Sequence, residues 1–426
     1  MDLVAKPSDE LTGKVTPNPS KFYTQFAIIA GLLAEGGSKI EEPLLVDDTR
    51  SLIKAVEEFG AETKRKKKEW TVWGTGESLV PQGQVVDAKK TMTGLSLLAP
   101  LTALIPRVMI VTGATKVRSR PVPTLINALQ NLGTDVNSVN SDDCPPLVSF
   151  GRQISGGGDF SLPDDMNPRF VPAAIVLLPL MEEKTSLEIP NHCRNDFLNI
   201  ALEILTQCGI DYDLDDSKLE VEPQKYESFE TTVPPDIFLS LPFVVGAILT
   251  DSELEVDRSE KLRNLEEFSE ILDNFEIDLA MEEDRILLDG SQVPSGGEIS
   301  LYRHPELLPF LAVLSLKADG EVRIVEAERA RNMKSDRISA MVEGLNSMNV
   351  SVEELEDGLV IDPTDVVEGT KVDGLRDEVV VAALGIAGLI ADGEMVVKNR
   401  AETLRESYPH FVSVFNDLGA DMSYGS

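Results

Sequence analysis

The chain has 426 residues, and its 39 Lys and Arg against 73 Asp and Glu give a formal net charge of −34. Such an acidic surface repels phosphate backbones and anionic lipid headgroups, which argues against partners among nucleic acids and membranes. Cys144, Cys193 and Cys208 lack CxxC spacing, so we expect neither a disulfide framework nor a zinc site. The first residues lack the apolar run of a signal peptide. Composition and length therefore favour a cytoplasmic globular protein with two domains.

Strongly apolar helical segments recur about every 70 residues along the chain. A helix that is apolar on nearly every face must be buried inside a domain. Ser, Thr, Asn or Asp opens several of these segments, and such residues cap helix N-termini. The six segments begin at Ser20, Thr91, Asn167, Asp236, Pro305 and Asp377.

An amphipathic helix alternates with each apolar segment. Gly, or failing that Asn, is favoured where a helix ends in a left-handed residue. The six amphipathic segments end at Gly60, Gly133, Gly209, Glu276, Asn349 and Gly419. Most are followed by two strand-like runs around a polar turn. The sequence therefore predicts an α/β fold of six βαβαββ repeats, three in each of two domains, with sheets around the buried helices. We expect the domains to face each other across a cleft that attracts anions through helix N-termini.

The basic run Lys64–Lys68 is the densest positive patch in the sequence. It lies between two strand-like segments, so we interpret it as a solvated hairpin turn rather than a nucleic-acid site. The following strand contains Trp70 and Trp73, which we expect to share one face.

Four segments carry a resemblance to a known family. They are PNPSKFYTQFAIIAGLLAEG near the start, VRSRPVPTLINALQNLG at 117–133, KSDRISAMVEGLNSMNV at 334–350 and ESYPHFVSVFNDLGA at 406–420. The chain resembles the enolpyruvyl transferases of the EPSP synthase type over nearly its whole length. The resemblance implies a two-domain inside-out α/β barrel, with residues 1–18 plus 235–426 in one domain and 19–234 in the other. It also implies a monomer that transfers the enolpyruvyl group of phosphoenolpyruvate to a hydroxyl of a phosphorylated substrate, without metal or organic cofactor.

Several positions match the family's motifs. Lys21 occupies the lysine of the PSK segment, and Arg120 the phosphoenolpyruvate-binding arginine of the RP motif. Arg337 is the arginine of the SDR motif, which contacts the phosphoenolpyruvate carboxylate in the family. Glu306 stands where the family has an essential Asp, so the resemblance makes it the candidate base for the acceptor hydroxyl. Arg and Lys are the side chains that such anionic substrates require.

Other positions depart from the family's pattern. Phe22 and Phe26 replace a Ser and an Arg that hold substrate. The substrate-phosphate motif becomes NPRF, which places Arg169 there, and the next substrate loop carries Arg194 and Phe197. The KESDR motif becomes MKSDR, so that Lys334 replaces either the catalytic glutamate or, after a deletion, the preceding lysine. DHR becomes DEV at 377–379, and a late lysine becomes Glu406.

The departures divide the expected function into alternatives. Positive charge is added by Lys334, Arg169 and Arg194, which favours a site adapted to another anionic acceptor. In such a site the catalytic pair would be Glu306 and Lys334. The substrate ligands would be Lys21, Arg120, Arg169, Arg194 and Arg337. Shikimate-3-phosphate is the other acceptor that the resemblance leaves open. The alternative to an enzyme is a binding or regulatory protein that has lost catalysis. RNA 3′-phosphate cyclase has a related fold, but the net charge of −34 argues against it.

Overall fold

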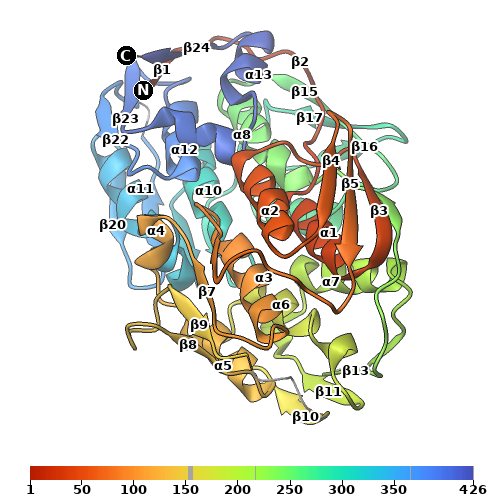
Figure 1. Ribbon diagram of the computed structural model, residues 1–426. Helices are drawn as coiled ribbons and strands as arrows, with labels where there is room; N and C mark the ends of the chain where they lie inside the picture. Colours follow the sequence, from red (N-terminus) through yellow and green to blue (C-terminus); the bar gives the residue numbers. More distant parts are fainter. Residues whose placement is uncertain (152–156, 216, 365, 426) are drawn as a thin grey trace. The chain divides into compact units, whose positions relative to one another are not determined.

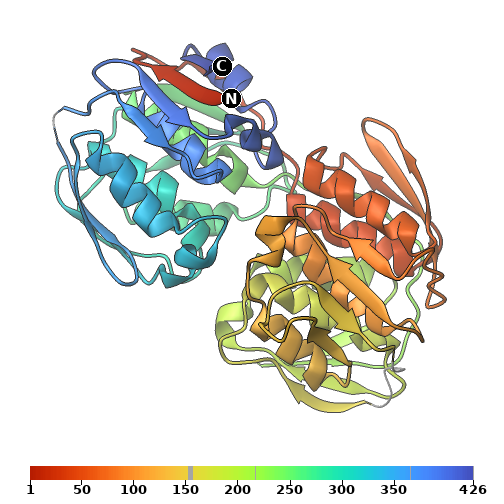
Figure 2. The same cartoon turned by 60° about the vertical axis from the view of Figure 1, so that its left-hand side comes forward.

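The computed structural model describes residues 1–151, 157–215, 217–364 and 366–425. The chain forms two compact units. Unit 1 contains Met1–Asn18 and Pro234–Ser426, and unit 2 contains Pro19–Val233. In Figure 2, unit 2 runs from red through yellow-green, and unit 1 is green to blue with a red strand. The chain therefore leaves unit 1 after its first strands and returns to it at Pro234.

Among the described residues, six four-stranded sheets share one topology. In each sheet one outer strand is parallel to its neighbour, and the other two pairings are antiparallel. Unit 2 has the orders β14-β3-β5-β4, β6-β7-β9-β8 and β10-β11-β13-β12. Its strands are β3 (Glu35–Glu41), β4 (Glu62–Arg65), β5 (Glu69–Thr75), β6 (Val85–Asp87), β7 (Met109–Thr112), β8 (Val136–Ser138), β9 (Leu147–Ser149), β10 (Gly158–Ser161), β11 (Thr185–Glu188), β12 (Tyr212–Leu214), β13 (Lys218–Val221) and β14 (Glu230–Thr232).

Unit 1 repeats this arrangement with the orders β16-β17-β15-β2, β18-β19-β21-β20 and β22-β23-β1-β24. Its strands are β1 (Asp2–Lys6), β2 (Gly13–Val15), β15 (Glu253–Asp257), β16 (Leu279–Met281), β17 (Arg285–Asp289), β18 (Gly297–Ser300), β19 (Val322–Val325), β20 (Ser351–Glu354), β21 (Leu359–Asp362), β22 (Lys371–Asp373), β23 (Met395–Lys398) and β24 (Asp421–Gly425).

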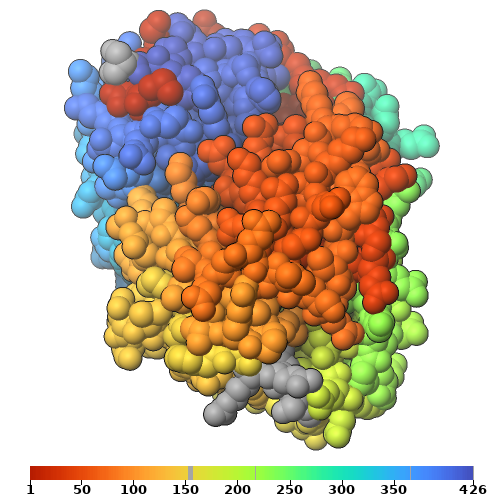
Figure 3. Space-filling view, in the orientation of Figure 1, coloured from red at the N-terminus to blue at the C-terminus, as the bar shows by residue number. Residues whose placement is uncertain are grey.

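The N-terminal residues complete two sheets of unit 1. Strand β1 lies between β23 and β24 and is antiparallel to both. Figure 1 shows the β1 label beside those of β23 and β24, and red atoms lie among blue ones on the surface in Figure 3. Strand β2 pairs in parallel with β15. The β1 pairings join residues about 400 positions apart and the β2 pairing joins residues about 240 apart, so the first 18 residues are structurally part of unit 1.

The apolar helices begin where their capping residues predict. All five N-caps predicted from Ser, Thr, Asn and Asp are confirmed, because Ser20, Thr91, Asn167, Asp236 and Asp377 each accept a backbone N–H in the first turn. The apolar helices are α1 (Lys21–Leu33), α3 (Met92–Ala103), η1 with α6 (Pro168–Phe170, Val171–Ile175), η4 with α8 (Ile237–Ser240, Leu241–Leu249), η5 with α10 (Pro305–Leu307, Leu308–Leu314) and α12 (Glu378–Ala387). Every residue of α12 is buried, and each large apolar side chain there contributes about 1.5–3 kcal/mol to folding.

Each amphipathic helix ends two or three residues before the predicted residue, which adopts a positive φ angle. The φ angles are 105° at Gly60, 83° at Gly133, 74° at Gly209, 66° at Asn349 and 113° at Gly419, and Glu276 adopts 55°. The left-handed ends expected from Gly and Asn are therefore confirmed, and Glu276 takes the same conformation without that preference. The helices are α2 (Asp47–Glu58), α5 (Pro123–Asn131), α7 (Asp196–Gln207), α9 (Leu265–Asp273), α11 (Arg337–Asn346) and α13 (Phe411–Asp417).

The basic run lies in the β4–β5 hairpin, as expected, with its cations exposed and several paired with glutamates. The expectation for the two tryptophans is wrong. Trp70 is 3% exposed and Trp73 is 41% exposed. Residues three apart on an extended strand point to opposite faces, so only Trp70 enters the core. Among the described helices, none combines the length and apolarity needed to cross a bilayer.

Candidate functional site

A buried ion pair joins three helix starts in unit 1. Arg337 is the first residue of α11, and Asp377 caps the N-terminus of α12. The Arg337 Nε and Nη2 atoms each donate to the Asp377 carboxylate at 2.9 Å, and Nη1 donates to the Glu306 carbonyl at 3.1 Å. Burial alone would lower the pKa of Arg337, but the Asp377 carboxylate outweighs this and raises it.

This geometry changes the interpretation of Arg337. The residue is 5% exposed, and its fork faces Asp377 rather than a solvent-filled space. The bidentate pair fixes the relative positions of η5, α11 and α12. Its role as a ligand of a substrate carboxylate stays a prediction, and the contacts favour a structural role.

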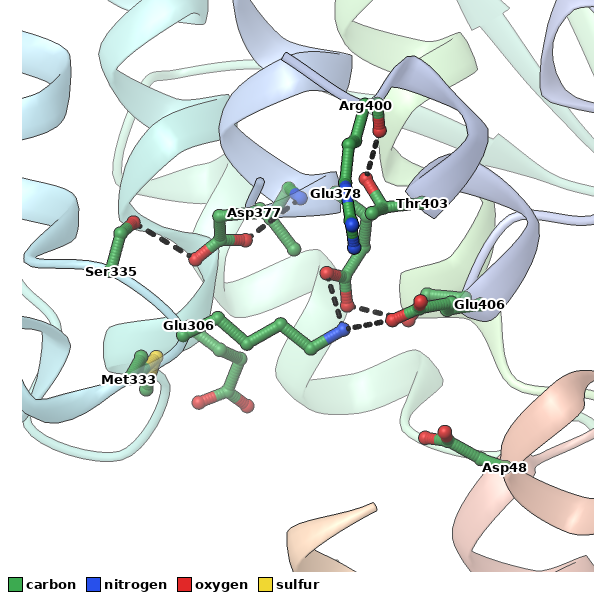
Figure 4. Close-up of polar contacts among 12 residues, drawn as sticks. Asp48, Glu306, Met333, Ser335, Asp377, Glu378, Arg400, Thr403 and Glu406 are labelled. Atoms are coloured by element: carbon green, nitrogen blue, oxygen red, sulfur yellow. Dashed lines mark hydrogen bonds and ion pairs between the residues drawn. The ribbon is translucent and has the colours of Figure 1, made fainter. Parts of the chain in front are cut away.

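Three of the positions that depart from the family's pattern meet in one cluster. The Lys334 ammonium lies 2.6 Å from a Glu378 carboxylate oxygen and 2.8 Å from one of Glu406. In Figure 4, dashed lines link the labelled Glu378 and Glu406 carboxylates through this nitrogen. Glu378 opens α12, and Glu406 ends η8 (Ala401–Glu406). We call Lys334, Glu378 and Glu406 the ion triad.

The ion triad is well shielded from water. The side-chain exposures are 22% for Lys334, 4% for Glu378 and 11% for Glu406. Ser407 also donates to Glu378 at 2.9 Å, so this carboxylate receives hydrogen bonds from two side chains. Sequence reasoning singled out Lys334 but missed that Glu378 and Glu406 hold it. The charges of the altered positions could have indicated this contact, because the altered motifs introduce one lysine, Lys334, and two glutamates, Glu378 and Glu406.

Glu306 stands beside a histidine in the same unit. The Glu306 Oε1 atom lies 3.5 Å from Nδ1 of His304, and Nε2 of His304 lies 3.5 Å from Oε2 of Glu267. Both are ion-pair distances rather than tight hydrogen bonds. Burial would lower the pKa of His304, but the two carboxylates raise it to about 9. His304 and Glu267 also line a pocket of about 370 Å³.

Unit 2 carries the remaining predicted ligands. Lys21 is the first residue of α1, and its Nζ atom lies 3.6 Å from Asp48 in the first turn of α2. Arg120 lies half-buried between α4 (Thr115–Arg118) and α5. Both cations are next to helix starts, where backbone N–H groups favour an anion.

The structure brings together some of the altered unit 2 positions. Phe22 packs edge-on against Phe197 with ring centroids 4.8 Å apart, and Phe26 lies 6.2 Å from Phe22. The Arg169 guanidinium lies 5.6 Å from the Phe197 ring centroid. Arg194 instead donates to the Asp215 carbonyl at 2.6 Å. Arg169 therefore belongs to an aromatic cluster, whereas Arg194 is committed to the neighbouring backbone.

Within the described ranges, no group of three or more His, Cys, Asp or Glu side chains is placed to hold a metal ion. Lys21, Arg337 and Asp377 lie at the starts of helices α1, α11 and α12.

Units of three four-stranded sheets around buried helices define the inside-out α/β barrel class. Comparison with known proteins identifies the family. The model of EPSP synthase (3-phosphoshikimate 1-carboxyvinyltransferase) matches residues 5–415, and the chain belongs to this family. The predicted family and fold class are thus confirmed.

The chain is 29% identical over 427 residues to the 3-phosphoshikimate 1-carboxyvinyltransferase of Methanocaldococcus jannaschii, covering 99% of both chains. It is 32% identical over 433 residues to that of Halobacterium salinarum, again with 99% of both covered. The EPSP synthase structure from Acinetobacter baumannii superposes with a TM-score of 0.83 at 21% identity, over 100% of both chains.

Proposed function

We propose that this protein is a carboxyvinyl transferase that uses phosphoenolpyruvate and a small anionic hydroxyl acceptor other than 3-phosphoshikimate. The observation that carries the proposal is Glu306, a partly exposed carboxylate held 3.5 Å from a histidine at the motif position of the family's base. Family membership over residues 5–415 supports the reaction type.

Carboxyvinyl transfer requires two proton transfers, one from the acceptor hydroxyl and one to C3 of phosphoenolpyruvate. The acceptor hydroxyl gives its proton to Glu306 while its oxygen bonds to C2 of phosphoenolpyruvate and an acid protonates C3. The conjugate base of that acid then takes a proton back from C3, which restores the double bond as the C2–O bond to phosphate breaks and phosphate leaves. Lys21 and Arg120 supply the positive charge for the phosphate, beside helix starts that favour anions.

The aromatic cluster argues for a different acceptor. Phe22, Phe26 and Phe197 have no side-chain donors, so they cannot replace the hydrogen bonds of a polyhydroxylated ring. The Arg169 guanidinium, next to Phe197, could bind an anionic group of the acceptor. These contacts favour an acceptor with an apolar face beside its negative charge.

A second candidate is a ligand-binding protein without turnover, and the ion triad favours it. Two carboxylates stabilise the charged form of Lys334, which opposes proton donation to carbon. Glu306 and Lys334 would then stand at the family's catalytic positions without transferring protons.

Replacing Arg120 with alanine is expected to weaken phosphoenolpyruvate binding ten- to a hundred-fold, about 1.5–3 kcal/mol, because a charge-assisted contact is lost. Isothermal titration calorimetry with phosphoenolpyruvate measures the change. The matched control is Arg118→Ala, since Arg118 is the exposed arginine of the adjoining helix α4. Equal affinities for wild type and Arg120→Ala would contradict the proposed role of Arg120.

A further inference from the structure

His304 is held between two carboxylates from different elements of unit 1. Glu306 follows it in η5 and faces Nδ1, while Glu267 reaches Nε2 from α9. The Phe238 ring packs against the imidazole with centroids 4.9 Å apart. Arg303 acts electrostatically on Glu267, and Glu270 and Glu326 are the other acids of the adjacent pocket.

The arrangement constrains the charge of the imidazole. A neutral imidazole carries one N–H and one lone pair, so one of the two carboxylates would face a lone pair. An imidazolium is attracted electrostatically to both acids at 3.5 Å, although Nε2 makes no hydrogen bond. The raised pKa of His304, about 9, agrees with this geometry. The pKa of Glu267 is lowered by the same contact.

We propose that His304, held charged by Glu267, is a positioning residue that fixes the carboxylate of Glu306. The proposal rests on the proposed function for its catalytic meaning, because Glu306 is there the proton acceptor. A cation at Oε1 attracts the Glu306 carboxylate and sets the direction of its second oxygen. Glu267 affects Glu306 only indirectly, through the His304 imidazole that lies between them.

The test is an NMR titration of the full-length protein, which has three histidines, His192, His304 and His410. In wild type, His304 should titrate near pH 9. In Glu267→Gln its pKa should fall by about one unit or more, because burial still opposes the charge while one carboxylate is gone. Glu270→Gln is the matched control, since Glu270 is an exposed acid of the same helix and pocket.

A kinetic readout separates positioning from a general structural effect. With an accepted substrate pair, Glu267→Gln should move the basic limb of the pH–rate profile to lower pH by the shift seen in the titration. A structural defect would lower the rate equally at every pH.

The two proposals fail in different ways. A wild-type His304 that titrates near its ordinary value, or one unchanged by Glu267→Gln, overturns the inference. If wild type shows no turnover while the titration behaves as expected, the proposed function fails and the charged His304 between its two acids stands.

Discussion

Replacing Asp377 with alanine is expected to lower the free energy of unfolding by about 3–5 kcal/mol, because it leaves the buried Arg337 guanidinium without its counter-charge. The pair is nearly inaccessible, with side-chain exposures of 6% for Arg337 and 0% for Asp377. The same change also removes the N-cap of α12. Urea denaturation at neutral pH measures the difference.

Two comparisons isolate the cause. Asp362→Ala removes an exposed aspartate of β21 and should leave stability within about 0.5 kcal/mol of wild type. The double variant Arg337→Met with Asp377→Leu should be more stable than Asp377→Ala, because no uncompensated charge remains buried. An Asp377→Ala protein as stable as wild type would show that the pair does not organise this region.

Lys334→Ala is expected to cost about 2–4 kcal/mol of unfolding free energy at neutral pH, since it leaves Glu378 and Glu406 facing each other. Urea unfolding at neutral pH measures the loss.

Lys398→Ala is the control, because Lys398 is an exposed lysine at the end of β23. A Lys334→Ala deficit that Lys334→Met recovers would mean that lost packing, rather than the two glutamates, is responsible. A deficit within error of zero would contradict the ion triad itself.

Local signals predict most of the fold. Capping residues such as Ser20 and Asp377 set helix starts, and glycines such as Gly133 set helix ends, because both act within one turn. The face of a strand on which a side chain lies was harder to predict. Trp73 was expected on the same face as Trp70, but residues three apart on a strand lie on opposite faces, and Trp73 is exposed. A short apolar run does not reveal which of its residues faces the core.

The sequence predicted several residues of the candidate site but not which of them contact one another. Sequence motifs pointed to Lys334, Glu306 and Arg337 separately. Their partners lie far along the chain, with Glu406 some 72 positions from Lys334 and Asp377 some 40 positions from Arg337. Such pairings depend on how repeats pack, which no local pattern encodes. Nothing in the local sequence marks His304, and its position between Glu267 and Glu306 is visible only in three dimensions.

The most direct test of the proposed function follows phosphate release from phosphoenolpyruvate by phosphorus NMR, with 3-phosphoshikimate and a panel of phosphorylated or carboxylated hydroxyl compounds offered separately. The account predicts no release with 3-phosphoshikimate, because Phe22, Phe26 and Phe197 line the cluster where its hydrogen-bond partners would lie. It predicts release, with formation of a carboxyvinyl ether, for an anionic acceptor with an apolar face. Efficient release with 3-phosphoshikimate, or no release with any acceptor, would contradict it.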